Sequence, residues 1–400
     1  MIKPKLALIP SGYKSGKVYS ILPNDGSGDF TFDRANGLST RVRKDGLIEE
    51  VSNDTPRLDW LNSDCPSLLL ENQSTNTQTY SESSTGKSLT GSTLTNDKAI
   101  SPTGEYNAME LKEDTSTGKH RFFTGNVTVV DGTTYTLSLF VKKNSDNRFI
   151  FINAGSLIGV SGSFDLDTQA VTGSVQLFET YPNGWYRIGI TEEASADVTN
   201  GYFVQLQQGT TDASYTGDES SVYVWGLQFE EGNLSSYIPN LATGSTTRSA
   251  ETCTGSTDAT IFNDSEGVLY AEISRESSVG NRQIELSDGS DSTRITIRFS
   301  SNGIYVSAVI NNISVISYGL NTTNLNQFYK VAIKYKSGNS LIYIDGVEVS
   351  TSTTTYTQTD TISELNFQQW WGGNSFYGRC KDLRYYDTAL TDAELTELTT

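Results

Sequence analysis

Two adjacent tryptophans near the C-terminus are the residues best suited to contact a ligand. Trp370 and Trp371 precede a pair of glycines that leave room for a ligand, and Asn374 and Tyr377 follow. Aromatic rings stack on pyranose faces, and amide groups bond to sugar hydroxyls. Because adjacent strand residues point to opposite faces, the two indoles cannot both be buried. These four residues form a candidate carbohydrate-binding site. The alternative is a ring that covers the sheet against a partner subunit or a helix.

The other three tryptophans have plainer interpretations. Trp225 alternates with Tyr223 and Leu227, which is the pattern of a core side chain. Trp185 lies beside a turn and is expected to pack. Trp60 stays open between packing and ligand contact.

Nucleophilic catalysis finds little support in the residue inventory. A Ser-His-Asp or Cys-His arrangement would need His120, the only histidine, and no nucleophile-elbow motif is present. The same lack of ligands excludes a His/Cys metal site. Some pair among the 47 Asp and Glu residues will lie at a hydrolase-like separation by chance. We expect a protein that is not an enzyme, with a polysaccharide depolymerase as the catalytic alternative.

Two oxygen-rich loops could hold calcium. Asp288 and Asp291 lie in LSDGSDST, and Asp165 and Asp167 lie in FDLDT. Neither loop has the EF-hand pattern, and an Asx-turn, in which the carboxylate caps its own backbone, is the favoured interpretation. We therefore expect no cofactor, with calcium left open.

Charge and hydropathy narrow the classes of partner. The formal net charge of -18 argues against nucleic acid, because phosphate would be repelled. The lysines that cluster, at 142–143 and at 330–336, sit on alternating runs and indicate solvated faces or protected sheet edges. No apolar run approaches a membrane span, and the N-terminus has no apolar stretch of the length that a secretory signal needs. Synthesis in the cytoplasm of the producing cell is expected. The three cysteines, Cys65, Cys253 and Cys380, are expected to be free and buried.

Composition and alternation predict an all-β fold. Tyr (21) and Phe (16) dominate the aromatics, and Met is scarce (2). Apolar residues alternate over Tyr135–Val141, over Tyr186–Ile190 and over Tyr223–Phe229, with Asn-Gly and Asp-Gly turns between such runs. Many short strands at this spacing favour a β-sandwich or a jelly roll. We expect two antiparallel β-sandwiches, a jelly roll followed by a second sandwich.

The chain is expected to divide in sequence order. Residues 1–50 are rich in Gly, Lys and Pro with weak alternation, so they form a separate N-terminal segment. Residues 51–239 form the jelly roll, and the polar stretch 240–256 is a linker. Residues 257–400 form the second sandwich.

The C-terminal region contains a hairpin whose register can be predicted. Asp345-Gly346 supplies the positive φ angles of a type I′ turn. Ile344 then pairs with Val347, Tyr343 with Glu348, and Ile342 with Val349, so that one face is fully apolar. Further on, Thr391 to Glu394 forms a capping box that begins a short helix.

This region resembles the concanavalin A-like and laminin-G-like lectin sandwich. In that family an Asx-Gly hairpin precedes a closing strand of the form F-x-G-x-x-x-D-x-R-x-Y, and a short helix ends the domain. The matching residues here are Phe376, Gly378, Asp382, Arg384, Tyr386 and Leu390. The resemblance covers about the last 140 residues and implies the fold without naming a ligand.

A second set of residues is similar to a family of bacteriophage tail-fibre and head-fibre proteins whose middle domain is a carbohydrate-binding jelly roll. The matching pieces are Arg41, Gly46, Pro56–Asp59, Leu68–Glu71, Asn183–Ile188, Trp225, Gly226, Phe229, Glu230, Gly232, Tyr237 and Pro239. The likeness implies a virion protein with outward-facing sandwiches, presented as an oligomer, with a trimer expected.

These observations lead to one expectation and two alternatives. The expected protein is a virion fibre that binds host surface glycan for adsorption, through many weak contacts made strong by several copies. Residues 1–50 would attach it to other virion proteins. The structural alternative is a capsid or tail decoration protein, and the catalytic alternative is the depolymerase. Neither nucleic acid nor membrane insertion is expected.

Overall fold

The computed structural model describes residues 2–145, 148–210, 214–255, 257–276 and 280–400. Met1 and Ser256, at the start of the expected N-terminal segment and at the end of the expected linker, lie outside the described residues. Strands account for 49% of the structure and helices for 5%, so the predicted all-β class is confirmed. The helical elements are α1 (Gly155–Ile158), α2 (Asp392–Thr399) and the 3₁₀ turns Pro182–Gly184 and Ala259–Ile261.

The chain divides into two compact units, each assembled from separate segments. Unit 1 comprises Met1–Ala35, Ser52–Asn72 and Ser249–Thr400, and unit 2 comprises Asn36–Val51 and Gln73–Arg248. This division differs from the expected one at residues 51, 239 and 256, which followed sequence order. The first 50 residues are shared between the units. Leu6–Leu8 and Phe30–Asp33 pair with strands far along the chain in unit 1, whereas Ser39–Val42 and Ile48–Val51 pair with each other in unit 2.

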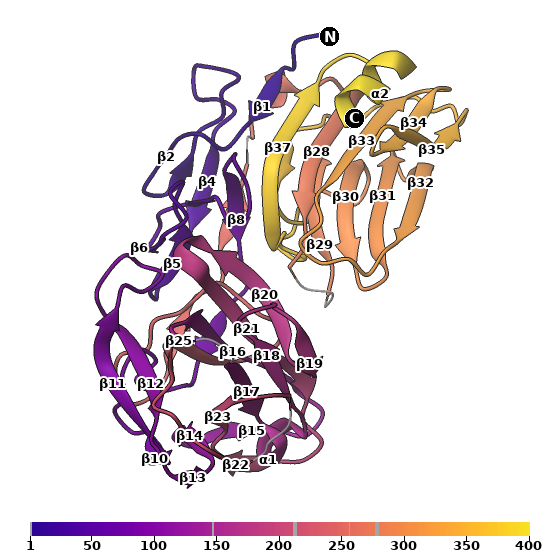
Figure 1. The fold of residues 1–400 in the computed structure, drawn as a ribbon. Coiled ribbons are helices and arrows are strands. Elements are labelled where there is room, and N and C mark those ends of the chain that lie inside the picture. The colour runs from indigo at the N-terminus through magenta and orange to yellow at the C-terminus, as the bar shows by residue number, and fades with distance from the viewer. Residues whose placement is uncertain (1, 146–147, 211–213, 256, 277–279) are drawn as a thin grey trace. The chain divides into compact units, whose positions relative to one another are not determined.

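Unit 1 is an antiparallel sandwich of two main sheets (Figure 1). The described strands of sheet A are, in spatial order, β35 (Val347–Ser352), β34 (Ser340–Ile344), β33 (Tyr329–Lys336), β28 (Glu266–Ser274), β37 (Gly378–Tyr386), β8 (Ser67–Leu70) and β7 (Arg57–Asp59), with β1 (Leu6–Leu8) also on β37. Those of sheet B are β32 (Ile313–Asn321), β31 (Gly303–Ile310), β30 (Arg294–Ser300), β29 (Arg282–Ser287) and β36 (Glu364–Asn366). A smaller sheet contains β2 (Tyr13–Lys14), β3 (Lys17–Val18), β4 (Phe30–Asp33) and β27 (Thr252–Thr254).

The core of unit 1 lies between sheets A and B. Alternate residues of both sheets point inward and are buried, such as Leu269 on β28 and Ile297 on β30. Period-two alternation in the sequence is what directs one face of each strand into this layer.

Strands from the N-terminal part of the chain complete sheet A. β1 pairs with one half of the free edge of β37 (Ala7 opposite Arg384), and β8 pairs with the other half (Leu69 opposite Arg379). Leu6 and Leu68 are fully buried in the core. An edge strand left open would expose unpaired N–H and C=O groups, and these two strands satisfy them. Residues 1–50 are therefore not a separate segment.

The predicted hairpin forms with one change of register. Asp345 and Gly346 have φ angles of 48° and 80°, as a type I′ turn requires. Ile344 pairs with Val347 as predicted, but a bulge makes Ile342 pair with Ser350 and not with Val349. Because Ser350 takes the place of Val349 opposite Ile342, the prediction of a fully apolar face was wrong, and Val347 is 59% exposed.

Helix α2 begins as the sequence predicted. The Thr391 hydroxyl accepts from the Glu394 N–H, and the Glu394 carboxylate accepts from the Thr391 N–H, so the capping box is confirmed. Leu395 and Leu398 of the helix pack with Tyr343 on the outer side of sheet A.

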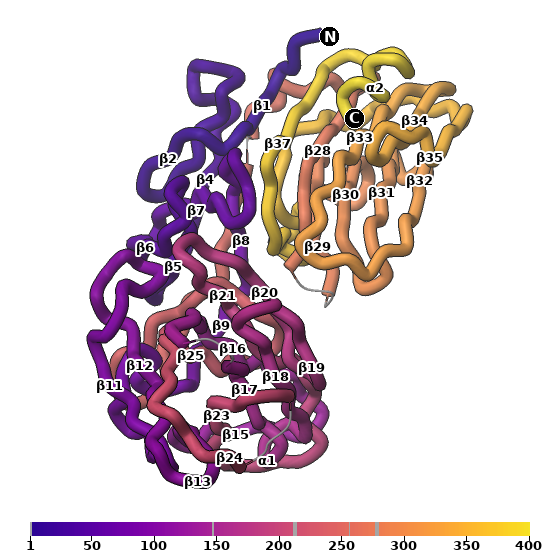
Figure 2. The backbone as a smooth tube through the Cα atoms, viewed as in Figure 1, coloured from indigo at the N-terminus to yellow at the C-terminus, as the bar shows by residue number. Residues whose placement is uncertain are grey.

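Unit 2 is a second antiparallel sandwich, as Figure 2 lets the reader trace along the chain. The described strands of sheet C are β10 (Ser88–Thr90), β14 (His120–Phe123), β23 (Phe203–Gln207), β17 (Phe149–Asn153), β18 (Ser161–Asp165) and β19 (Val171–Gly173). Those of sheet D are β11 (Ser92–Ala99), β12 (Ala108–Glu113), β25 (Ser221–Glu231), β16 (Thr134–Lys143), β21 (Trp185–Glu193) and β20 (Gln176–Tyr181). The short pairs are β5 (Ser39–Val42) with β6 (Ile48–Val51), β9 (Ser74–Asn76) with β26 (Thr246–Arg248), β13 (Thr117–Gly118) with β24 (Tyr215–Thr216), and β15 (Val127–Val129) with β22 (Val198–Asn200).

A bulge in β25 changes the expected facing of its side chains. The register against β16 shifts next to Gly226, whose φ of 60° favours glycine. Val224 and Leu227 therefore both enter the core between sheets C and D, while Trp225 packs on the other face against Phe140 and Tyr237. Trp225 is buried as predicted, but it does not share a face with Leu227.

Cysteine exposure also differs from expectation. Cys253 and Cys380 are buried free thiols, as predicted, whereas Cys65 is exposed. Cys65 lies in the connection between β7 and β8, where its side chain is not drawn into a sheet face.

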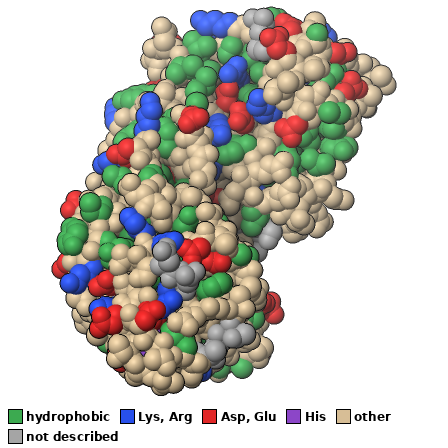
Figure 3. All heavy atoms as spheres, in the orientation of Figure 1, with side chains coloured by type: hydrophobic (Ala, Val, Ile, Leu, Met, Phe, Trp, Pro, Cys, Tyr) green, Lys and Arg blue, Asp and Glu red, His purple; other side chains and the backbone are tan. Residues whose placement is uncertain are grey.

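The surface shown in Figure 3 has acidic and basic side chains interspersed among polar and hydrophobic ones. Among the described residues, no helix has both the length and the apolar character needed to cross a membrane.

Candidate functional site

The four predicted site residues lie on one loop of unit 1, between β36 and β37. Phe367 and Phe376 close the base of this loop: the Phe376 N–H donates to the Phe367 carbonyl at 2.8 Å. Both rings are buried in the core with their centroids 5.7 Å apart. The loop of residues 368–375 therefore projects from a fixed stem.

Trp370 and Trp371 occupy the two central positions of a tight turn. The Gly372 N–H donates to the Gln369 carbonyl at 2.8 Å, and the Gln369 N–H donates to the Gly373 carbonyl at 2.8 Å. The tryptophans are thus turn residues and not strand residues, and the prediction that they point to opposite faces of a strand was wrong. Neither ring is buried.

Trp370 is held from both ends. Its backbone N–H donates to Glu285 Oε1 at 2.8 Å, and its indole Nε1–H donates to Asp291 Oδ1 at 3.3 Å. Glu285 belongs to β29 and Asp291 to the connection from β29 to β30. The ring is half-buried. Trp370 thus fixes the turn to sheet B.

Glu285 is the buried carboxyl beneath this turn. Besides the Trp370 N–H, it accepts from Gln283 Nε2 at 2.8 Å and from Thr296 Oγ1 at 3.3 Å. Burial raises the pKa of Glu285 to about 7, against the lowering effect of the Trp370 N–H and the Thr296 hydroxyl. The carboxyl that accepts from the Trp370 N–H therefore changes charge near neutral pH.

Trp371 is the exposed member of the pair. Its side chain is 59% accessible, and the ring lies against the backbone of Gly373. A Cβ at Gly373 would come within 1.9 Å of the indole Cη2, so only glycine permits this contact. The indole is thus held by close contact while it stays open to a ligand.

The side chains of Asn374 and Tyr377 make contacts that stabilise the loop, and neither is fully exposed for ligand binding. The Asn374 amide donates to Gln369 Oε1 at 2.8 Å, and its backbone carbonyl accepts from the Gln283 N–H at 3.0 Å. The Tyr377 ring is half-buried, with the Arg282 guanidinium 4.8 Å from its centroid. These contacts join the loop to β29 on both sides.

The functional residues that the sequence reasoning missed lie on β29. Arg282, Gln283 and Glu285 support the loop from the neighbouring strand. For Gln283 and Glu285 the signal was the alternation in RQIELS, where these two share one face with Ser287 while Ile284 and Leu286 take the other; Arg282 falls on the apolar side and carried no such signal.

In each of the two candidate calcium loops, a carboxylate accepts a hydrogen bond from a backbone N–H of the same loop. Asp165 Oδ1 accepts from the Asp167 N–H at 2.8 Å, and Asp288 Oδ1 accepts from the Ser290 N–H at 2.9 Å. Asp167 is in contact with Lys143. These are the Asx-turns of the favoured interpretation. The described residues contain no group of three or more His, Cys, Asp or Glu side chains that could hold a metal ion.

The single histidine, His120, is buried, and both of its ring nitrogens lie near backbone carbonyl oxygens. His120 Nδ1 lies 2.5 Å from the Gly91 carbonyl oxygen, and Nε2 lies 3.3 Å from that of Tyr215. Its ring also packs on Tyr215, with the centroids 4.7 Å apart. Both nitrogens thus face backbone acceptors within unit 2.

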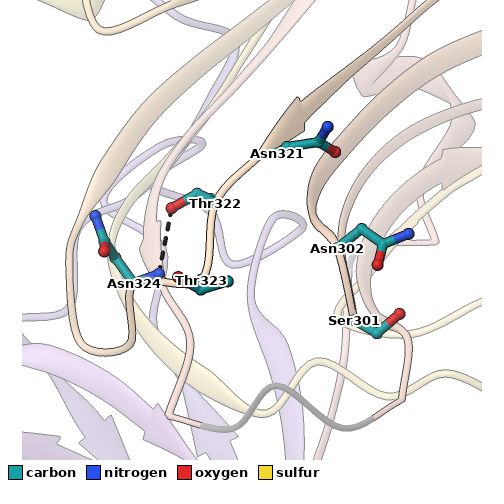
Figure 4. A pocket seen from close by; sticks show the side chains of 6 residues that line it. All are labelled: Ser301, Asn302, Asn321, Thr322, Thr323 and Asn324. Carbon is teal, nitrogen blue, oxygen red and sulfur yellow. Dashed lines mark hydrogen bonds between the residues drawn. The ribbon is translucent and has the colours of Figure 1, made fainter.

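A polar pocket lies elsewhere in unit 1, at the turn between β30 and β31 and the chain that leaves β32 (Figure 4). It is lined by Ser301, Asn302, Asn321, Thr322, Thr323 and Asn324. The Asn324 N–H donates to Thr322 Oγ1 at 3.3 Å. Its lining offers neither an aromatic ring nor a charge, so it is a poorer candidate than the tryptophan turn.

Comparison with known proteins supports the predicted fold of the C-terminal region. Residues 256–396 match the family model described as the concanavalin A-like lectin/glucanases superfamily. No curated protein matches the chain.

Several solved structures are similar to parts of the chain. The CBM40 of the Ruminococcus gnavus IT-sialidase, bound to α2,3-sialyllactose, is 13% identical with a TM-score of 0.29 and covers 36% of this chain and 86% of its own. Domain 4 of an extracellular arabinanase from Geobacillus stearothermophilus, in complex with arabinotriose, is 18% identical with a TM-score of 0.31 and covers 38% and 73%. Domains LG4-5 of the mouse laminin α1 chain are 10% identical with a TM-score of 0.25 and cover 67% and 89%. Values of this size carry no argument about ligand or activity.

Proposed function

We propose that the protein binds carbohydrate through the tryptophan turn of unit 1 and acts as a bacteriophage fibre that attaches to host surface glycan. The observation that carries the proposal is the exposure of Trp371 on a turn whose backbone is fixed. An indole that is already held in place loses little conformational freedom when a sugar stacks on it.

The fibre assignment rests on the resemblance of the residues spread from Arg41 to Pro239. A single shallow ring gives weak binding, and several copies on one particle raise the overall avidity by orders of magnitude. A trimer presented on a virion would supply those copies. Exposed apolar side chains near the N-terminus, Ile2, Tyr19 and Ile21, offer a surface for other virion proteins.

We further propose that binding occurs without catalysis. His120 is fully buried and both of its ring nitrogens face backbone carbonyl oxygens, so it presents no base to a substrate at the surface. Release of reducing ends from host envelope polysaccharide would contradict this part of the proposal.

The test is saturable binding of labelled full-length protein to a panel of intact bacteria, with and without free envelope polysaccharide as competitor. We expect binding to one host, abolished by the polysaccharide and weakened at least tenfold by Trp371→Ala. The matched control is Tyr106→Ala, which removes an exposed ring of unit 2 and should leave binding unchanged. Binding to no strain by folded protein, or equal loss in both variants, would contradict the proposal.

A further inference from the structure

The outward face of sheet C in unit 2 carries an aromatic group that the proposed function does not use. Alternate residues of β14 and β23 enter the core, as Phe122 and Val204 do. Their neighbours point the other way: Phe123 pairs with Phe203 across the strands, with ring centroids 5.3 Å apart. The ring centroid of Phe151, on β17, lies 6.0 Å from that of Phe203, so the group extends across a third strand. Phe151 is buried, whereas Phe123 and Phe203 are half-buried, so these two rings offer part of their surface to a flat apolar partner.

A cation lies over this platform without a carboxylate partner. The Arg121 guanidinium is 4.5 Å from the Phe123 ring centroid and 4.4 Å from that of Phe203. Within the described part of the chain, no Asp or Glu oxygen forms an ion pair with Arg121 within 4.0 Å, and its Nε is buried with no hydrogen-bond partner. Two buried arginines of unit 2, Arg148 and Arg187, do have acidic partners, in Glu113 and Glu179. A negatively charged group of a bound ligand could therefore pair with the Arg121 guanidinium.

A buried amide beside the platform also lacks partners. Gln205 lies between Arg121 and Phe151 in the strand register and is fully buried. Neither its Oε1 nor its Nε2 has a hydrogen-bond partner. Burying an amide with both ends unsatisfied is unfavourable, and native proteins rarely keep one unless a ligand or water completes it.

We infer that the outward face of sheet C is a second binding site, for a pyranose that carries a carboxylate. Arg121, which covers Phe123 and Phe203 in the free protein, would swing aside, and the apolar face of the sugar ring would then stack on the two uncovered rings. The planar guanidinium of Arg121 would bind the carboxylate at two points, a geometry that a guanidinium fork matches. Movement of Arg121 toward the ligand would open the amide of Gln205 to a sugar hydroxyl. This site is separate from the tryptophan turn and does not depend on the function proposed for that turn.

The first experiment is calorimetric titration of the full-length protein with galacturonate, glucuronate and N-acetylneuraminate, each beside its neutral methyl ester. We expect at least one acid to bind saturably and its ester to bind at least tenfold more weakly, since the ester removes the charge that Arg121 matches. Saturable binding by none of the three acids, or equal binding of acid and ester, would overturn the inference.

Variants separate a binding role from a structural one. Gln205→Leu removes the unsatisfied amide, so we expect an unchanged or higher Tm together with an affinity at least tenfold lower. Arg121→Gln should lower affinity for the acid but not for the ester. The matched control is Arg298→Gln in unit 1, where a guanidinium also stacks on a ring, that of Tyr305 at 4.7 Å, and also has an unpartnered Nε.

The outcomes are distinguishable from those of the proposed function. Trp371→Ala should leave binding of the acidic sugar unchanged, even where it abolishes attachment to bacteria. Loss of acidic-sugar binding in Trp371→Ala or in Arg298→Gln, or full binding by Gln205→Leu, would overturn the assignment of this ligand to sheet C.

Discussion

Arg57 and Glu251 form a two-point ion pair inside unit 1, where both side chains are fully buried. Arg57 Nε donates to Glu251 Oε1 at 2.8 Å, and a second guanidinium nitrogen contacts Oε2. Arg34 donates to the same carboxylate at 2.8 Å, and Arg57 also pairs with Glu71 at 2.6 Å. Segments far apart in the sequence are thus joined by buried charge.

Glu251→Gln should therefore lower the free energy of unfolding of unit 1 by about 3–5 kcal/mol, because Arg34 and Arg57 both lose the buried carboxylate that they share, although Arg57 still pairs with Glu71. Urea unfolding of the purified variant measures this. Asp45→Asn, which breaks the exposed pair with Arg43, is the control and should leave the midpoint unchanged. An unchanged midpoint for Glu251→Gln would show that the buried network adds little.

The buried carboxyl beneath the tryptophan turn predicts a dependence of stability on pH. The pKa of Glu285 is about 7 in the folded chain and 4.5 in the reference state, so the folded state binds the proton more tightly. This group's contribution is greatest below about pH 4.5 and is lost as the pH rises to about 7. Glu285→Gln should remove that part of the slope when the free energy of unfolding is measured from pH 4 to 8. Parallel curves for the two proteins would contradict the prediction.

The bulge in β25 predicts a position that accepts only glycine. Gly226→Ala places a Cβ 2.8 Å from the Phe140 ring at a φ of 60°, so it should destabilise unit 2 by about 1–3 kcal/mol or more. Gly118→Ala is the control, because nothing lies within 4 Å of its added Cβ. Thermal unfolding compares the two variants, and equal Tm values would contradict the prediction that position 226 requires glycine.

Thiol reactivity should distinguish the three cysteines. Cys65 is exposed, whereas burial raises the pKa of the Cys253 and Cys380 thiols. Native protein should react with a thiol reagent at one site per chain, and denatured protein at three. Mass spectrometry identifies the modified residue; rapid native modification of Cys380 would contradict its burial in the core.

Local features of the fold could be predicted from the sequence, and features set by distant contacts could not. Alternation and turn pairs indicated the strands, the Asp345-Gly346 hairpin and the capped helix. The bulge at Val349 was missed because an extra backbone residue between Glu348 and Ser350 leaves no mark in the residue types. The bulge at Gly226 was missed because the residues on either side of it alternate as an unbroken strand would.

The candidate site shows the same limit. The loop that bears Trp370 could be chosen from residue type alone, but its turn conformation depends on Glu285, which lies 85 positions earlier. Several residues that carried the fibre resemblance prove to be scaffold: Arg57 and Glu71 belong to the buried ion network, and Gly226 to a bulge. Such residues identify a fold and cannot identify what it binds.

The completion of β37 by both β1 and β8 has a consequence for how such a chain can evolve. A recombination event that transferred only the gene segment for residues 249–400 would deliver a strand whose edge lacks both of its partners. The transferred product would aggregate through that edge or fail to fold. Exchange between related genes should therefore transfer the coding regions for β1, β8 and β37 together. Recombination breakpoints that leave a functional protein should not fall between the regions that encode β8 and β37.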